Sequence, residues 1–179
     1  QNVIDKLEEY YEGERIENHQ INIVVGVVDN EKNYVINPMF ISKVCTINYV
    51  EHSFEAFDKS DVAIVASGTA TLECAITETP MVVIYKMSKI SWWISKYFIK
   101  IPFASIVNIL AEKPKGIVKE FLQNSCLTAN IFLEVKKLLY DDGDVVGPRA
   151  KQKREMKQII KKLGNGSAYK QTADFIIKS

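Results

Sequence analysis

The sequence predicts an α/β domain built on a parallel sheet of the doubly wound type. Apolar runs at 21–28, 62–66 and 81–85 are rich in β-branched residues, which is typical of strands buried on both faces. Helical stretches separate these runs, and such alternation indicates parallel strands with helical crossovers. The length of 179 residues fits one such domain with an appended helical segment.

The first half of the chain supplies the alternating elements. In order, we expect a helix at 2–12, strands at 21–28 and 44–48, a short helix at 53–57, a strand at 62–66, a helix at 70–78 and a strand at 81–85. The helix at 2–12 is predicted because its apolar residues recur on one side. Pro80 introduces the last of these strands.

Beyond residue 87 the pattern becomes helical. Helices are expected at 89–99, 117–123, 129–140, 146–163 and 167–178. We therefore divide the chain into a sheet domain over 1–144 and C-terminal helices over 145–179. We expect this sheet to lack a strand that would precede residue 2, and the resulting edge would favour a homo-oligomer.

Composition and charge exclude several classes of protein. The formal net charge is +1, which gives no overall attraction for nucleic acid, and no nucleic-acid partner is expected. Cys45, Cys74 and Cys126 form no C-x-x-C pair, and an odd count argues against a disulfide framework. Reduced thiols indicate a compartment such as the cytoplasm. No apolar run reaches the roughly 18 residues that a spanning helix needs.

A glycine-containing loop directly follows the strand at 62–66. In doubly wound sheets, ligands bind beyond the carboxyl ends of the strands, where Ser67, Gly68 and Thr69 lie. Gly68 permits a tight turn, and Thr69 or Thr71 is expected to cap the next helix. Amides at a helix start favour a diphosphate. Glu73 lies one turn further, where a carboxylate suits ribose hydroxyls. An ordinary helix cap remains the alternative.

Four motifs occur in a fixed order between residues 61 and 123. They are Ser67-Gly68-Thr69-Ala70-Thr71-Leu72-Glu73, then Thr79-Pro80-Met81-Val82-Val83 with Tyr85, then Asn108-Ile109-Leu110-Ala111, and Glu120-Phe121-Leu122-Gln123. Together they resemble the lipid-A-disaccharide synthase family of two-domain, GT-B-type glycosyltransferases. The close match covers about a third of the chain.

The resemblance implies a reaction and a division of labour. The family transfers 2,3-diacylglucosamine from UDP-2,3-diacylglucosamine to 2,3-diacylglucosamine 1-phosphate, with inversion and release of UDP. It implies no cofactor and no metal, since amides and polar side chains stabilise the leaving diphosphate. The Rossmann-like C-terminal half of such enzymes holds the nucleotide sugar. This chain resembles that half, so the catalytic residues are expected in the acceptor domain and none in this chain.

The family's donor-site residues map onto seven positions. They are Ser67, Gly68, Thr69 and Thr71 for the diphosphate, Glu73 for the ribose, Asn108 for the donor and Gln123 near the sugar. The alternatives are a turn cap for Asn108 and a solvated helix end for Gln123. The family's Gly-Ser-Arg loop is not in this chain, and the 112–117 loop is slightly longer than its family counterpart. We therefore expect weak binding and poor catalysis from this chain by itself.

An aromatic and basic stretch spans residues 86–103. Its candidates for membrane contact are Lys89, Trp92, Trp93, Lys96, Tyr97 and Lys100. Tryptophan, tyrosine and lysine suit the interface of an anionic bilayer, which favours a peripheral position at the inner membrane. A helix that packs on the sheet or on another domain is the alternative. The basic segment 149–162 is expected to be a solvated amphipathic helix with Met156, Ile159, Ile160 and Leu163 inward, and a second membrane or phosphate contact is the alternative.

Two other classes of function remain open at this point. One is a different GT-B enzyme that uses UDP-N-acetylglucosamine. The other is a non-catalytic module that binds a nucleotide or a membrane. The other UDP-N-acetylglucosamine enzymes share a helix glutamate that binds ribose. Their sequence in the segment that corresponds to the residues after Pro80 differs from the one found here.

Overall fold

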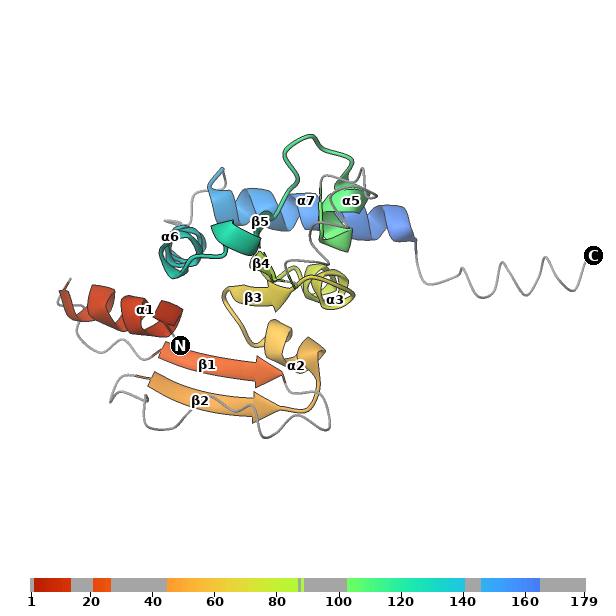
Figure 1. The fold of residues 1–179 in the computed structure, drawn as a ribbon. Helices are drawn as coiled ribbons and strands as arrows, with labels where there is room; N and C mark the ends of the chain where they lie inside the picture. The colour runs from red at the N-terminus through yellow and green to blue at the C-terminus, as the bar shows by residue number, and fades with distance from the viewer. Residues whose placement is uncertain are drawn as a thin grey trace, which may run out of the picture.

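The structure, a computed structural model, describes residues 2–13, 21–26, 45–86, 88, 103–140 and 146–164. Its elements are α1 (Asn2–Gly13), β1 (Ile21–Gly26), β2 (Cys45–Val50), α2 (Ser53–Asp58), β3 (Ala63–Ala66), α3 (Ala70–Ile76), β4 (Met81–Tyr85), α5 (Ile106–Ala111), β5 (Lys119–Leu122), η3 (Gln123–Ser125), α6 (Thr128–Leu139) and α7 (Pro148–Leu163). Every paired strand is parallel to its neighbour, which confirms the predicted fold class (Figure 1).

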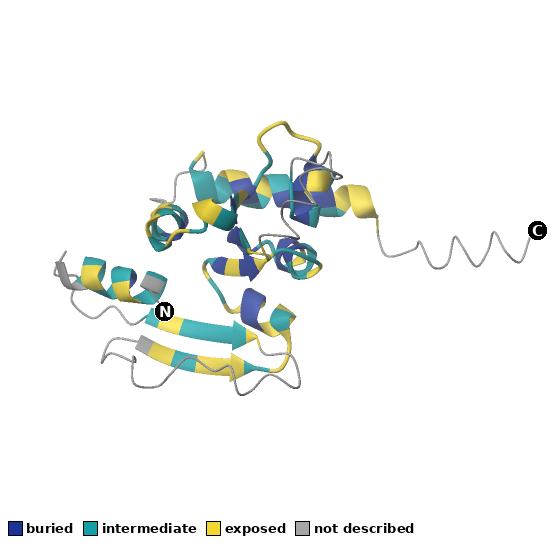
Figure 2. Cartoon of the chain, viewed as in Figure 1, coloured by how far each residue is buried: buried dark blue, intermediate teal, exposed yellow. Residues whose placement is uncertain are grey.

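The three-stranded sheet β3-β4-β5 forms the centre of the molecule. Side chains of β4 alternate between its faces: Met81 and Val83 join a core with α2, α3, α5 and α7, whereas Val82 joins a second core with α1 and α6. Helices therefore cover both faces, as a doubly wound sheet requires. The burial is densest here, and most of the dark-blue ribbon in Figure 2 belongs to this sheet and the helices around it.

The second sheet contains only β1 and β2, and it is less buried than predicted. No described residue of β1 is fully buried, so the prediction of a strand buried on both faces is wrong for Ile21–Gly26. The same prediction is half wrong for β3, where Ala63 and Val65 are buried but Ile64 is exposed. Of the described helices, α6 contacts β4 and β5, and Ile64 lies 45% exposed on β3.

The segment at 117–123 is a strand followed by a 3-10 turn, so the predicted helix is wrong. The spacing of Ile117, Val118 and Phe121 fits one helical face, but so short a helix is marginal on its own. Pairing with β4 places Phe121 in the core instead. The helix α5, which the sequence did not predict, precedes this strand and begins at the side-chain cap of Ser105.

The C-terminal helices are confirmed for α6 and α7. Met156 and Ile159 of α7 are buried in the core and Ile160 packs against it, as predicted. Leu163 is exposed, because it lies in the last turn of α7, beyond the sheet. The helices expected at 89–99 and 167–178 lie outside the described residues.

Candidate functional site

The carboxyl edge of the central sheet brings the predicted loop and Gln123 to one side of the molecule. Ser67 extends β3 by one residue, since its N–H donates to the Ile84 carbonyl of β4 at 3.1 Å. Tyr85 at the end of β4 pairs with Leu122 of β5, and Gln123 follows directly. Ligands of doubly wound sheets bind at this edge. The two predicted sites, far apart in sequence, therefore share it.

The loop between β3 and α3 turns at Gly68. Its φ of +139° lies in the region that favours glycine, and a Cβ built there would meet no atom within 4 Å. The first turn of α3 closes onto the loop, since the Thr71 N–H donates to the Gly68 carbonyl and the Leu72 N–H to that of Thr69. Within the described ranges, the amides of Gly68, Thr69 and Ala70 have no backbone acceptor. The loop thus has amides without a backbone acceptor next to a glycine whose Cβ position is open.

The three loop hydroxyls have different surroundings. Ser67 Oγ donates to the Ala104 carbonyl at 2.6 Å, and Thr71 Oγ1, which is fully buried, donates to the Gly68 carbonyl at 2.7 Å. Thr69 is the N-cap residue of α3 and is exposed, but its side chain makes no cap hydrogen bond. The predicted side-chain cap is therefore wrong. Ser67 and Thr71 use their protons to brace the loop, whereas the Thr69 side chain stays accessible.

Glu73 lies one turn into α3 and is half-buried. The hydroxyl of Ser53, the first residue of α2, donates to Glu73 Oε2, so one carboxylate oxygen is held from outside α3. The end of β1 reaches the same place, because a Cβ on Gly26 would lie 3.1 Å from Ser53 Cα. Sequence reasoning missed Ser53. Its position just after β2, at the carboxyl edge, was the available signal.

Asn108 is 1% exposed and its amide is engaged inside the protein. Oδ1 accepts from the N–H groups of Ile117 at 2.7 Å and Val118 at 3.0 Å, and Nδ2 donates to the Val118 carbonyl at 2.9 Å. The Asn108 amide therefore holds the turn before β5. Gln123 is half-buried at the sheet edge, with a φ of +49°.

Glu120, on β5, forms a further polar centre that the sequence placed in a motif but not among the site residues. Its carboxylate accepts hydrogen bonds from the Ala104 N–H at 2.7 Å, the Ser105 N–H at 3.1 Å, the Ser105 hydroxyl at 2.6 Å and the Asn108 amide at 2.7 Å. Charge-assisted hydrogen bonds of this kind are roughly twice as strong as neutral ones. The segment before α5 is therefore anchored to β5.

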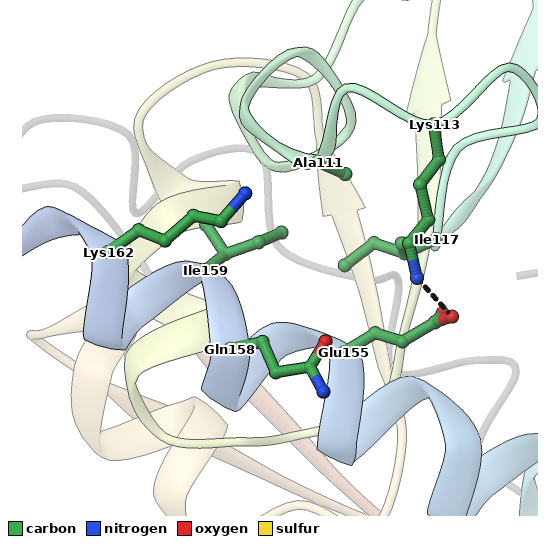
Figure 3. A pocket seen from close by; sticks show the side chains of 7 residues that line it. All are labelled: Ala111, Lys113, Ile117, Glu155, Gln158, Ile159 and Lys162. Atoms are coloured by element: carbon green, nitrogen blue, oxygen red, sulfur yellow. Dashed lines mark hydrogen bonds and ion pairs between the residues drawn. The ribbon is translucent and has the colours of Figure 1, made fainter.

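One small hollow lies away from this edge, between α7 and the loop after α5 (Figure 3). Its volume is about 40 Å³, whereas pockets for drug-sized ligands measure about 300–1,000 Å³. Lys113 lines one side of it and pairs with Glu155 of α7 at 2.6 Å. The hollow is too small for a nucleotide sugar.

The six candidates for membrane contact, Lys89, Trp92, Trp93, Lys96, Tyr97 and Lys100, lie outside the described residues. In the part of the chain that is described, no helix has the length and apolar character needed to cross a membrane.

Comparisons with known proteins agree with this geometry. The model of the lipid-A-disaccharide synthetase family matches residues 8–176. Lipid-A-disaccharide synthase 1 of Legionella pneumophila (strain Paris) is 36% identical over 112 residues, which are 62% of this chain and 29% of that relative. The synthase of Serratia proteamaculans (strain 568) is 42% identical over 87 residues, 49% of this chain and 22% of the relative.

A longer match is to the lipid-A-disaccharide synthase of Rickettsia typhi (strain ATCC VR-144 / Wilmington). It is 36% identical over 146 residues, 80% of this chain and 36% of the relative. The chain thus spans about a third or less of the length of these curated relatives. Because the family match runs through nearly the whole sequence, the chain belongs to the lipid-A-disaccharide synthetase family.

Proposed function

We propose that this chain is the donor-binding part of a lipid-A-disaccharide synthase. The whole protein would transfer 2,3-diacylglucosamine from UDP-2,3-diacylglucosamine to 2,3-diacylglucosamine 1-phosphate and release UDP. The names of the relatives support the activity. The observation that carries the donor role is the glycine loop at the sheet edge with Glu73 one turn beyond it.

In this proposal the loop receives the diphosphate and Glu73 the ribose. The amides of Gly68, Thr69 and Ala70, which have no backbone acceptor within the described ranges, supply donors, and the exposed Thr69 hydroxyl supplies another. Ser53 occupies Oε2 of Glu73, so Oε1 is the oxygen left for ribose hydroxyls.

The same loop would assist the chemical step. In an inverting transfer, the acceptor hydroxyl attacks the anomeric carbon, its proton passes to a base, and the bond to UDP breaks. Negative charge then develops on the diphosphate, and preformed donors at that position lower the barrier. We place Gln123 near the sugar, whereas Asn108 contributes by holding the turn before β5. The base belongs to the acceptor domain, so this chain alone should bind UDP without transferring sugar.

The strand topology supports a further strand in the whole domain. Doubly wound sheets commonly have the order 3-2-1-4-5-6. Here β2 and β1 would take positions 3 and 2, and β3, β4 and β5 would take positions 4, 5 and 6. Position 1 then lies between β1 and β3, which no ladder joins among the described strands. We propose that a parallel strand of the whole protein occupies this place and merges the two sheets.

The aromatic and basic stretch at 86–103 is our candidate for contact with the inner membrane. The substrates that we propose carry acyl chains, which places the reaction at a bilayer surface. Co-sedimentation with anionic vesicles, compared between the chain and a Trp92→Ala/Trp93→Ala variant, tests this part. Equal sedimentation of the two would contradict it.

Calorimetric titration of the folded chain with UDP tests the donor role. We expect UDP to bind and Glu73→Ala to weaken binding by about 1–3 kcal/mol, the cost of losing a polar partner. Glu134→Ala, on α6, where the glutamate pairs with Lys137, is the matched control and should leave the affinity unchanged. ADP should compete poorly. Absence of heat with UDP, from chain shown to be folded, would refute the donor role.

A further inference from the structure

We propose that Glu120 is a positioning residue of the donor site, acting through Ala104 on the Ser67-Gly68-Thr69 loop. The proposal rests on the proposed function, because it concerns the loop to which the diphosphate is assigned. Glu120 lies on β5 and the loop follows β3, so the two are separated by β4 in the sheet. A connecting element is therefore needed, and the segment before α5 provides it.

The Glu120 carboxylate binds the backbone of this segment. Glu120 Oε2 accepts from the Ala104 N–H at 2.7 Å, and Oε1 accepts from the N–H and the hydroxyl of Ser105. The hydroxyl of Ser105 in turn accepts from the Asn108 N–H and caps α5. The carboxylate thus fixes the backbone at two successive residues.

Ala104 in turn is hydrogen-bonded to the loop. The same residue whose N–H is held by Glu120 accepts, at its carbonyl, the Ser67 hydroxyl at 2.6 Å. The backbone of Ser67 is fixed independently, because its N–H donates to Ile84. Ser67 is therefore held at main chain and side chain immediately before Gly68, where the chain turns. This arrangement sets the direction in which the following amides point.

The site requires an anion rather than a neutral amide. The four groups that contact the carboxylate within the described residues, from Ala104, Ser105 and Asn108, are all hydrogen-bond donors. In Glu120→Gln, an NH₂ group would replace one acceptor oxygen and face a donor. The Ala104 and Ser105 segment would lose an acceptor, and Ser67 would lose its fixed partner.

The consequence for binding is specific to the loop. Preorganised donors retain their advantage only while their positions are fixed before the ligand arrives. Releasing Ala104 should therefore raise the Kd for UDP by about tenfold, or 1.4 kcal/mol. Ser67→Ala breaks the same connection from its other end and leaves the carboxylate intact. If both substitutions act through Ala104, the Kd of the double variant for UDP should be no higher than the higher of the two single-variant Kd values.

The test combines UDP calorimetry with two-dimensional NMR of backbone amides in the wild-type chain, Glu120→Gln, Ser67→Ala and the double variant. Glu134→Gln provides a control of equal charge change. We expect both single variants to shift the Gly68 and Thr69 amide signals, to weaken UDP binding and to be non-additive. The control should do none of these.

The outcomes separate this proposal from the proposed function. If wild-type chain binds UDP but Glu120→Gln and Ser67→Ala bind it equally well, the positioning role is overturned and the donor role stands. If the wild-type chain binds no UDP, the donor role fails, and the NMR signals of the backbone amides then test the positioning role by themselves. Gly68 and Thr69 signals that do not shift in folded Glu120→Gln would overturn the positioning role as well. Additive losses of UDP affinity in the double variant would also overturn the positioning role, since they would show that Glu120 and Ser67 affect binding independently.

Discussion

Gln152 of α7 substitutes for a missing backbone partner of β4, and its replacement is the sharpest test of how the sheet is held. Its Oε1 accepts from the Met81 N–H at 2.7 Å, and its Nε2 donates to the Met81 carbonyl at 3.2 Å. Strand β5 begins opposite Val82, one residue too late to pair with Met81. The side-chain amide therefore completes the ladder at the start of β4.

Gln152→Met keeps the length and the helix propensity of the side chain but removes both polar groups. Met81 is fully buried, so its N–H and carbonyl would lose their partner away from water. An unsatisfied buried group costs about 1–3 kcal/mol, and the longer bond to the carbonyl belongs at the low end. We expect the free energy of unfolding to fall by about 2–4 kcal/mol, the range for two such groups.

Urea unfolding followed by far-ultraviolet circular dichroism measures this change. With a slope of about 2 kcal/mol per molar urea, the midpoint should fall by about 1–2 M. Gln158→Met, at an exposed position of the same helix, is the matched control and should leave the midpoint nearly unchanged. Equal midpoints for the two variants would refute the view that Gln152 completes the sheet.

Two further predictions concern the packing around the site. In urea unfolding, Gly116→Ala should destabilise the chain by more than Gly164→Ala. Both glycines have positive φ, but only at Gly116 would an added Cβ lie 2.7 Å from Asn108 Oδ1. Equal losses of stability in the two variants would contradict this packing. Burial raises the pKa of the Cys74 thiol to about 12 from its ordinary value of 9.0. In a chain with Cys45 and Cys126 changed to serine, Cys74 should resist thiol reagents until unfolding. The contribution of the buried Cys74 thiol to stability should be complete below about pH 9 and be lost as pH rises toward about 12, because only the unfolded state releases the proton in this range. The variant Cys74→Ala should flatten that decline in stability. A fast reaction of Cys74 with a thiol reagent in the folded chain at neutral pH would contradict the burial.

Much of the sheet was predictable from local patterns. The runs at 62–66 and 81–85 are short, apolar and bounded by turn residues, and both are strands. The segment at 117–123 was predicted wrongly because its apolar spacing suits a helix, while its strand state depends on β4. The helix α5 was missed because its run is apolar on most sides and depends on the cap of Ser105.

The place of several candidate residues at the edge of the sheet was predictable, but their hydrogen-bond partners were not. The Ser67-Gly68-Thr69 loop and Glu73 lie at the predicted edge of the sheet. Ser53 was not a candidate, and Glu120 was noted in a motif but not among the site residues, because neither a serine at a helix start nor a glutamate in a strand stands out as functional in sequence. Their importance comes from partners, Glu73 for the first and Ala104 for the second.

The amino-acid sequence by itself determined the parallel α/β class, the position of the glycine loop and the family, since each depends on patterns or motifs within short stretches. Only the tertiary structure decided which donor meets which acceptor. The Ser67 bond to Ala104 spans 37 residues, and the Gln152 bond to Met81 spans 71. A polar side chain in a core must find such a partner because an unmet hydrogen bond there is costly, but the sequence does not say where the fold will supply it.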